Sequence, residues 1–223
     1  EYDLMFKDFN IESRYVSEWK KYNFLELSAK GIKQGFRAYS LANPPHDNKI
    51  MMLNIRIATP PPGTEGIPPG LGSSYIFGLK PGDKVTISGP YGDFMAKDTD
   101  NEMCFIGGGA GMAPLRSHIL HQLDGIHTKR KVSFWYGARS KKEMFYDDVF
   151  KDLEKRHDNF SYNIALSNPN EEDHWDGLTG FIHTHLCDTY LCRHEDPTQI
   201  EFYLCGPPPM INAIINALYD LGV

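Results

Sequence analysis

Residues 103–114 read Met-Cys-Phe-Ile-Gly-Gly-Gly-Ala-Gly-Met-Ala-Pro, an apolar run followed by a glycine-rich turn and a proline. The apolar run has the length of a buried strand, and proline is favoured in the first turn of a helix. Glycines at such a turn let the backbone approach a ligand, and the helix N-terminus offers free N–H groups to a phosphate. The stretch favours a dinucleotide-binding turn over a merely tight one, although Met112 stands where a strict G-x-G-x-x-G motif has its third glycine.

Strand and helix patterns alternate from Glu102 to the C-terminus. Strands are expected at residues 103–106, 132–136, 160–166 and 201–204, and helices at residues 114–123, 142–155, 181–191 and 209–221. This alternation indicates crossover units and a parallel sheet, which binds ligands at the carboxyl ends of its strands.

The first 97 residues have a different pattern, with short β-branched runs and most of the turn-forming prolines. They predict strands at residues 33–41, 50–58 and 84–88, a surface loop at 59–70, a tight turn at 80–83 and a short helix at 12–20. Three strands are too few to close a barrel, so earlier strands are expected upstream of Glu1. The fold class is therefore a two-domain one: an antiparallel β-barrel, incomplete at its N-terminus, over residues 1–98, then an α/β parallel-sheet nucleotide-binding domain over residues 99–223.

The composition is that of an ordinary globular protein, with 223 residues, 41% of them hydrophobic, and a formal net charge of −6. The acidic balance argues against a nucleic-acid surface, and the basic run Lys129-Arg130-Lys131 is interpreted as a solvated turn. No apolar run reaches about 18 residues, so no membrane span is predicted in this chain, and no signal peptide is recognised.

Arg37-Ala38-Tyr39-Ser40 lies on an expected strand, so Arg37 and Tyr39 share one face and Ser40 takes the other. These side chains suit a flavin: a guanidinium for phosphate, a phenol to lie against the ring, and a hydroxyl for a ring nitrogen. Gly70-Leu71-Gly72-Ser73-Ser74 predicts a turn that opens a short helix at Tyr75 and holds a pyrophosphate at its N-terminus.

Cys205-Gly206-Pro207-Pro208 follows the last expected strand and precedes the last expected helix. Sheet geometry puts it beside the glycine turn at 107–111, with the Cys205 sulfur where a nicotinamide ring would sit. Cys104 lies inside a strand and is expected in the core.

No metal site is predicted, because neither the cysteines nor the histidines have the spacing of a ligand set. The helical histidines are interpreted as core or solvated side chains; they are His118, His121, His183 and His185. Four cysteines in a chain of this length indicate a reducing compartment rather than a disulfide framework.

Taken in order, these motifs resemble the ferredoxin–NADP reductase superfamily, a flavin-binding barrel followed by a nucleotide-binding α/β domain. Longer strings, among them Arg56-Ile57-Ala58-Thr59-Pro60-Pro61-Pro62 and Tyr136-Gly137-Ala138-Arg139-Ser140-Lys141, are similar to the family of flavin- and NADH-binding subunits of the sodium-translocating NADH:quinone oxidoreductases. That resemblance runs through nearly the whole chain. It implies FAD as flavin, NADH as electron donor, and a 2Fe–2S cluster that takes the electrons one at a time toward quinone.

The resemblance also implies residue roles. Arg37 and Ser73 contact the FAD phosphates, Tyr39 lies along the isoalloxazine, Ser40 reaches its N5 region, and Gly70 and Gly72 shape the pyrophosphate turn. The nucleotide side comprises Gly108, Gly109, Gly111, Tyr136, Arg139, Cys205, Gly206 and Pro207, with Tyr136 and Arg139 nearer the adenosine half. Ser40 and Cys205 are the residues expected at the reacting atoms.

The family carries a membrane helix and a cluster domain N-terminal to this region, and a C-terminal tail with an aromatic residue over the flavin. This chain contains none of these, so the cluster is expected on a missing N-terminal domain; the absence of the first barrel strands puts FAD retention in question. The expected partners are the other subunits of a membrane quinone reductase complex, and the expected location is the cytoplasmic face of the bacterial inner membrane, with this fragment itself soluble.

Three questions stay open in the sequence. Arg139, Lys141 and Lys142 would suit a 2′-phosphate and hence NADPH, whereas the resemblance indicates NADH. The reductase component of a soluble oxygenase would share the main motifs. A regulatory nucleotide-binding module without flavin is the third reading, but Arg37, Tyr39 and Ser40 are all intact.

Overall fold

The computed structural model describes residues 3–30, 35–61, 63–64 and 66–223. The chain forms two compact units, each discontinuous in sequence. Residues 1–39 and 55–94 make up the N-terminal unit, and residues 40–54 and 95–223 make up the C-terminal unit. Ser40–Asn54 therefore belongs to the unit that contains the parallel sheet, although it lies within the region expected to form the flavin domain.

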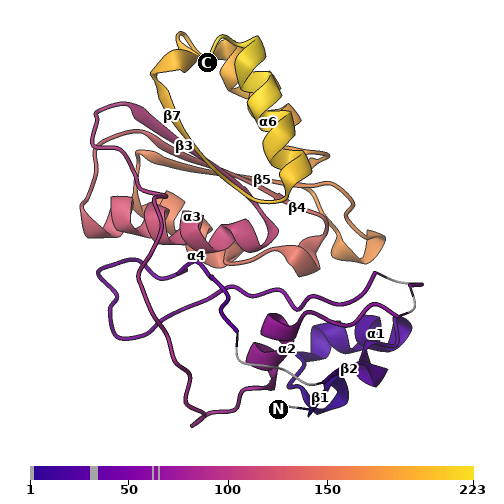
Figure 1. Ribbon diagram of the computed structural model, residues 1–223. Coiled ribbons are helices and arrows are strands. Elements are labelled where there is room, and N and C mark those ends of the chain that lie inside the picture. The colour runs from indigo at the N-terminus through magenta and orange to yellow at the C-terminus, as the bar shows by residue number, and fades with distance from the viewer. Residues whose placement is uncertain (1–2, 31–34, 62, 65) are drawn as a thin grey trace. The chain divides into compact units, whose positions relative to one another are not determined.

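The C-terminal unit is built on a five-stranded parallel sheet (Figure 1). The strands are β3 (Glu102–Gly108), β4 (Val132–Ala138), β5 (Phe160–Leu166), β6 (Leu178–Thr179) and β7 (Ile200–Cys205). Their spatial order is β6-β5-β4-β3-β7. The chain runs outward from β3 through β4 and β5, then returns to place β7 on the other side of β3. The strand order thus reverses between β3 and β7.

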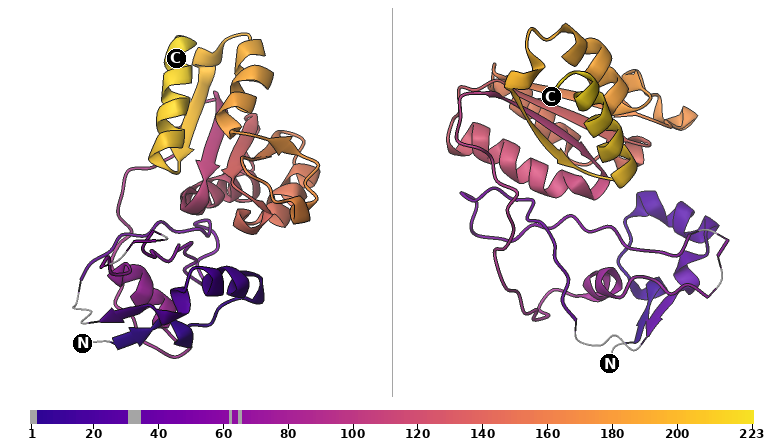
Figure 2. Two further views of the ribbon diagram at one scale, coloured as in Figure 1. Left: turned by 90° about the vertical axis from the view of Figure 1, so that its right-hand side faces the viewer. Right: turned by 45° about the horizontal axis from the view of Figure 1, so that its top comes forward.

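Two layers of helices cover the sheet, and Figure 1 shows α3 and α4 on one side with α6 on the other. The helices are α3 (Met112–Leu120), α4 (Asp147–Arg156), α5 (Ile182–Thr189) and α6 (Pro208–Asp220). Alternate residues of β3 enter the two cores: Phe105 packs with residues of α3 and α4, whereas Ile106 packs with residues of α5 and α6. Apolar burial on both faces explains why these strands read as continuous hydrophobic runs. The two further views in Figure 2 show the same layers.

The expected elements of this half are confirmed, with shifted ends. The helix expected at 142–155 begins later, at Asp147, after a 3-10 turn at Lys141–Glu143. The helix expected at 114–123 begins at Met112 and continues beyond Leu120 as a π-helical turn, His121–Gly125. Other short 3-10 segments lie at Phe6–Asp8, Phe24–Glu26, Gly109–Gly111, Glu171–Asp173, Leu191–Arg193 and Pro197–Gln199.

The N-terminal unit contains a small antiparallel sheet of β1 (Asp3–Met5) and β2 (Ser28–Lys30), with Asp3 opposite Lys30. Two helices accompany it, α1 (Ser13–Lys21) and α2 (Leu71–Gly78). Its core is aromatic and is formed by Phe6, Phe9, Trp19 and Ala29. The helix expected at 12–20 is confirmed as α1, and the short helix expected from Tyr75 begins earlier, at Leu71.

The prediction of strands at 35–41, 50–58 and 84–88 is wrong. In the described residues of these three runs, the one pairing is an isolated bridge between Leu41 and Leu53. Residues 33 and 34 of the first run lie outside the described residues. The runs are extended but lack ladder partners, and side chains such as Phe36, Met51 and Ile87 are largely exposed. β propensity alone does not make a strand, because a strand exists through its hydrogen bonds to a neighbour.

The turn at 80–83 is confirmed. The Asp83 N–H donates to the Lys80 carbonyl oxygen over 3.0 Å, and Gly82 has a φ of 99°, which a residue with a side chain rarely adopts. Within the described part of the chain, no helix is both long and apolar enough to cross a membrane.

Candidate functional site

Two glycine-containing turns meet where the strand order of the sheet reverses. One turn follows β3 and leads into α3, and the other follows β7 and leads into α6. Since β3 and β7 are parallel neighbours, with Gly107 in register with Cys205, both turns leave the same edge of the sheet side by side. The carboxyl edge at such a reversal is the usual ligand crevice of an open α/β sheet.

The two turns approach each other too closely for side chains. A Cβ atom on Gly111 would overlap the carbonyl group of Cys205, and one on Gly206 would lie 3.0 Å from the backbone nitrogen of Gly108. Gly109 has a φ of 54°, the left-handed conformation that glycine adopts without strain. The structure therefore brings together Gly108, Gly111, Cys205 and Gly206, four of the residues expected on the nucleotide side.

The starts of α3 and α6 differ in their capacity to bind an anion. The first N–H groups of a helix have no partner within the helix, but the Met112 N–H donates to the carbonyl oxygens of Gly109 and Ala110 in the 3-10 turn Gly109–Gly111, so the N–H groups that face an anion at the start of α3 are those of this glycine turn. The first helical residues of α6 are Pro208 and Pro209, which have no N–H group. The glycine turn before α3 thus fits a dinucleotide phosphate, whereas the turn before α6 forms a rigid wall beside it.

Cys205 is half-buried at the end of β7, and burial raises the pKa of its thiol. The group is therefore a neutral thiol at pH 7, suited to packing against a ring rather than to nucleophilic attack. Met210 is a residue that the sequence did not single out: its sulfur would lie 3.1 Å from a Cβ on Gly108. A methionine directly after the three prolines is the sequence signal for that contact.

Tyr136 and Arg139, both expected near the adenosine half, lie in different environments. The Tyr136 side chain is fully buried in the core, and its hydroxyl donates to the carbonyl oxygen of Glu143 over 3.1 Å. This corrects the expectation for its side chain, which has no exposed surface to offer a ligand. Arg139 is exposed and forms an ion pair of 3.1 Å with Glu143.

In the N-terminal unit, the start of α2 lies against Arg37 and Tyr39. A Cβ on Gly72 would be 2.7 Å from Arg37 Cγ and 3.2 Å from the Tyr39 hydroxyl oxygen. Both side chains therefore lie on one face of the segment, as expected, and Gly72 is the residue that lets them approach the helix. An exposed guanidinium beside free helix N–H groups fits a pyrophosphate, and the partly exposed Tyr39 ring is available for stacking.

Ser73 and Gly70 form a compact bonded turn at the same helix end. The Ser73 hydroxyl donates to the Gly70 carbonyl oxygen over 3.1 Å and accepts from the Ala58 N–H over 3.0 Å. The Gly70 N–H in turn donates to the Ala58 carbonyl oxygen over 2.8 Å. Because the hydroxyl proton of Ser73 is already committed, the backbone N–H is the group it offers to a phosphate.

Ser40 is exposed and belongs to the C-terminal unit, whereas Arg37 and Tyr39 belong to the N-terminal unit. The boundary between the units thus falls inside the Arg37-Ala38-Tyr39-Ser40 motif.

Two of the helical histidines and Cys104 are accounted for by packing. His118 stacks on Phe105 and Tyr203 of the core, and His183 stacks on the ring of Phe181. Cys104 is fully buried, as expected, and burial raises the pKa of its thiol to about 12.

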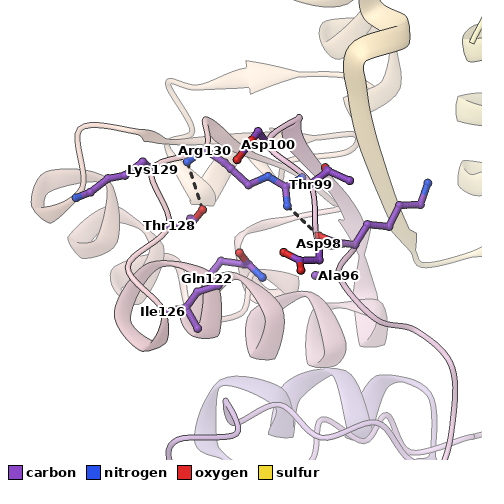
Figure 3. Close-up of a pocket in the computed structure, with 10 residues that line it drawn as sticks. Ala96, Asp98, Thr99, Asp100, Gln122, Ile126, Thr128, Lys129 and Arg130 are labelled. Atoms are coloured by element: carbon purple, nitrogen blue, oxygen red, sulfur yellow. Dashed lines mark hydrogen bonds between the residues drawn. The ribbon is translucent and has the colours of Figure 1, made fainter.

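A separate open pocket of about 640 Å³ lies before the amino ends of β3 and β4 (Figure 3). Its lining includes Lys97, Asp98, Gln122 and Arg130. Arg130 is bound to neighbours there, since it donates to the Lys97 carbonyl oxygen over 3.0 Å and pairs with Glu201 over 2.6 Å. The pocket is at the edge of the sheet opposite the two glycine turns and is not part of the nucleotide site.

Family models match both halves of the chain. An oxidoreductase FAD-binding domain matches residues 18–95, and an oxidoreductase NAD-binding domain matches residues 105–215. Among solved structures, the cytochrome P450 reductase GcoB from Amycolatopsis is 28% identical, with a TM-score of 0.65 over 82% of this chain and 52% of that one. The cytochrome b5 reductase domain of Ulva prolifera nitrate reductase, at 22% identity, shares the fold with a TM-score of 0.72 over 87% of this chain and 78% of that one.

The chain therefore belongs to the ferredoxin–NADP reductase superfamily, and it carries the FAD-binding and NAD-binding domains of these oxidoreductases. Within the superfamily it is a homologue of the subunit designated F in the Na(+)-translocating NADH-quinone reductase. The homologue in Mannheimia succiniciproducens is 58% identical over 98% of this chain, and that in Actinobacillus succinogenes is 57% identical over 99%. The chain spans about half the length of these relatives, 53% and 54% respectively.

Proposed function

We propose that this chain is the module that oxidises NADH with FAD and passes the electrons singly to a 2Fe–2S cluster outside the chain, toward quinone reduction coupled to sodium transport. The observation that carries the first step is the pair of glycine turns at the carboxyl ends of β3 and β7. The domains would be residues 1–98 for FAD and residues 99–223 for NADH. The later steps are drawn from the names of the relatives.

The redox chemistry belongs to the cofactors, which when bound supply a hydride transfer from nicotinamide to flavin. The chain's own residues would bind the cofactors and orient them toward each other. Arg37 and the start of α2 would hold the flavin phosphates, Tyr39 would offer its ring to the isoalloxazine, and Ser40 would offer its hydroxyl to a ring nitrogen. The start of α3 holds the phosphates of NADH, and Cys205 limits the nicotinamide pocket on one side. No residue needs to act as a strong acid or base, which agrees with the neutral thiol of Cys205.

NADH is favoured over NADPH by the surroundings of Arg139. Its guanidinium pairs with Glu143, and a carboxylate at this point would repel a 2′-phosphate. A carboxylate beside the ribose is the common arrangement in NAD-specific sites.

The proposed partners are the other subunits of a membrane quinone reductase, and the proposed location is the cytoplasmic face of the bacterial inner membrane. Both rest on the relatives rather than on a feature of this chain. The alternative, the reductase component of an oxygenase, draws on a weaker likeness: a structure described as the ferredoxin reductase in carbazole 1,9a-dioxygenase is 26% identical, with a TM-score of 0.58 over 84% of this chain and 52% of that one.

The test is the visible spectrum of the FAD-loaded protein during anaerobic addition of NADH, with NADPH in a parallel cell. Rapid bleaching by NADH is the expected result. Flavin bleached by NADPH alone would move the function to another reductase, and failure to bind flavin at all would leave a nucleotide-binding module. Electron delivery to membranes that contain the quinone reductase, compared with delivery to an oxygenase, separates the two enzyme readings.

The proposed flavin contacts have a separate test. Tyr39→Ala and Ser40→Ala should each lower flavin content or the rate of flavin reduction, while Tyr39→Phe, which keeps the ring, should retain most of both. If both alanine variants have the flavin content and the reduction rate of the unaltered protein, the contacts are assigned to the wrong residues.

A further inference from the structure

The segment Ser40–Asn54 is an internally bonded loop. Leu41 and Leu53 form an antiparallel bridge, and the Ala42 N–H donates to the Met52 carbonyl oxygen over 2.7 Å. The Asn43 amide closes the loop from within: it donates to the carbonyl oxygens of Asp47 and Ile50 and accepts from the Met52 N–H. Ala42 and Asn43 are buried, so the base of the loop packs against the rest of the C-terminal unit.

Helix α3 holds this base by two hydrogen bonds. The Arg116 guanidinium donates from Nη1 to the Ala42 carbonyl oxygen over 2.6 Å, and the Ser117 hydroxyl donates to the Asn43 carbonyl oxygen over 2.9 Å. The partners are 74 residues apart in sequence. Two consecutive helix residues therefore hold two consecutive loop carbonyls, and both bonds lie close to Ser40.

Tyr146, just before α4, completes the attachment. Its ring lies under the Arg116 guanidinium, 4.6 Å from Cζ to the ring centroid, and its hydroxyl donates to Asn54 Oδ1 over 2.6 Å. The loop is thus held at both ends, near Ala42 by Arg116 and at Asn54 by Tyr146.

Arg116 makes this contact although burial is unfavourable for its charged guanidinium. Its Nε is buried without a hydrogen-bond partner, and burial lowers the pKa of the guanidinium. An apolar side chain would fill such a space without desolvating a charge. A charged donor instead fixes the direction of one carbonyl group, which is a reason for its presence beyond packing.

We propose that Arg116 is a positioning residue for flavin reduction: through the Ala42 carbonyl it holds Ser40 in register with the glycine turn that precedes α3. This inference rests on the proposed function. Arg116 lies five residues after Gly111, a rise of about 7.5 Å or about one and a half turns along α3, so a short rigid piece of helix connects the glycine turn to the loop that carries Ser40. Ser117 and Tyr146 support the same register.

The first experiment uses the cofactor-free protein and follows backbone amide hydrogen exchange. Arg116→Met keeps an apolar stem but removes the donor, and we expect exchange in peptides from residues 40–54 to be faster by about tenfold, with peptides from β3 unchanged. Arg116→Lys, which keeps a donor, should restore part of the protection. Unchanged exchange in Arg116→Met would overturn the inference, whatever the cofactors do.

The second experiment measures anaerobic single-turnover reduction of bound FAD by NADH. In Arg116→Met we expect the rate constant to fall by at least about tenfold, because displacement of reacting groups by an ångström is costly, while FAD content and the NADH dissociation constant stay within about twofold. Arg14→Met is the matched control: Arg14 also stacks on a tyrosine, Tyr15, but it lies on α1 and pairs with the exposed Glu12 carboxylate instead of a loop carbonyl. Its rate constant should not change.

The outcomes separate the two claims. If NADH does not bleach the flavin of the unaltered protein, the proposed function fails and takes the inference with it. If NADH bleaches the unaltered protein and Arg116→Met at the same rate, only the inference fails. If flavin reduction in Arg116→Met is slower only because the variant has lost FAD or binds NADH more weakly, the inference is also overturned. Should Arg116→Met fail to fold, Ser117→Ala and Tyr146→Phe each remove a single hydroxyl and give the same comparison.

Discussion

The backbone of Gly111 lies against the carbonyl group of Cys205 so closely that no Cβ atom fits between them. Gly111 opens α3 and Cys205 ends β7, so this contact joins the two turns at the point where the strand order reverses. The turns therefore form one surface, and a change at either is transmitted to the other through backbone rather than through flexible side chains.

Gly111→Ala should disrupt this surface. The added methyl group must displace the Cys205 backbone, and we expect a loss of about 2 kcal/mol in the free energy of unfolding, together with weaker NADH binding and unchanged FAD content. Denaturant unfolding and NADH titration measure the two effects. Gly222→Ala is the control, because a Cβ atom on Gly222 would have open space around it. Only the positive φ of this residue, 78°, disfavours a side chain there. Normal NADH affinity in Gly111→Ala would contradict the assignment of this turn.

Cys205→Ala should slow flavin reduction by NADH with FAD content nearly unchanged. The half-buried thiol would border the nicotinamide, and its loss leaves a gap in which the ring is less well oriented. Burial raises the pKa of the thiol above its ordinary value of 9.0, so the thiol is protonated at neutral pH and contributes no step to the pH–rate profile between pH 6 and 8. A thiolate step in that interval, present in the unaltered protein and absent from Cys205→Ala, would refute the neutral assignment.

Glu143→Gln should shift nucleotide preference toward NADPH. The substitution removes the carboxylate that pairs with Arg139 and leaves the guanidinium free for a 2′-phosphate. We expect the ratio of kcat/KM for NADPH to that for NADH to rise by about tenfold, the size of effect that one charge-assisted contact has on binding. Lys151→Gln, which breaks the pair of an exposed lysine with the partly buried Asp147 elsewhere on the unit, is the control. An unchanged ratio would show that Arg139 does not face the ribose.

Glu201→Gln should destabilise the protein in a pH-dependent way. Glu201 and Arg130 form a buried ion pair of 2.6 Å, to which Thr99 and Tyr203 add hydroxyl donors. Burial raises the pKa of Glu201, but the hydrogen bonds from Thr99, Tyr203 and Arg130 outweigh it and lower the pKa below 4.5. A buried pair that loses one partner costs about 3 kcal/mol, so the variant should be less stable by about that amount at pH 7.

The sign of the pH effect follows from the lowered pKa. The contribution of ionised Glu201 to the free energy of unfolding is fully present above pH 4.5. It is lost as the pH falls through the pKa that Glu201 has in the folded state. The stability difference between the unaltered protein and Glu201→Gln should therefore narrow below pH 4.5. Glu12→Gln, at an exposed pair with Arg14, should cost less than about 1 kcal/mol and serves as control. A difference that is constant with pH would contradict the ionised state of Glu201.

The sequence predicted the parallel sheet well because its strands are buried on both faces and are bounded by turn residues. β5 has the predicted limits, 160–166, and the meeting of the two glycine turns followed from strand alternation alone. Tyr136 could have been assigned correctly by the same reasoning: it alternates with Phe134 on β4, and both enter one core. The motif around Tyr136 indicated a role near the adenosine, whereas the alternation of side chains along β4 indicated a core position.

Other features depend on contacts that no local pattern contains. The assignment of Ser40–Asn54 to the C-terminal unit rests on hydrogen bonds from Arg116 and Ser117, residues far along the chain. The available signal was a charged residue, Arg116, directly after the apolar Leu115 on α3. The extended runs at 35–41, 50–58 and 84–88 have strand composition, but composition cannot supply a neighbouring strand. The cofactor roles of Arg37, Tyr39, Ser40 and Cys205 stay predictions.

The discontinuity of the two units has a practical consequence for dissecting the protein. The chain passes between them three times, after Tyr39, after Asn54 and after Phe94. A recombinant piece that begins at Met95 would leave out a portion of its own interior, and the surface of α3 around Arg116 and Ser117 would meet solvent. Binding studies on the nucleotide half alone therefore call for a circular permutation or a fusion that returns residues 40–54 to that half.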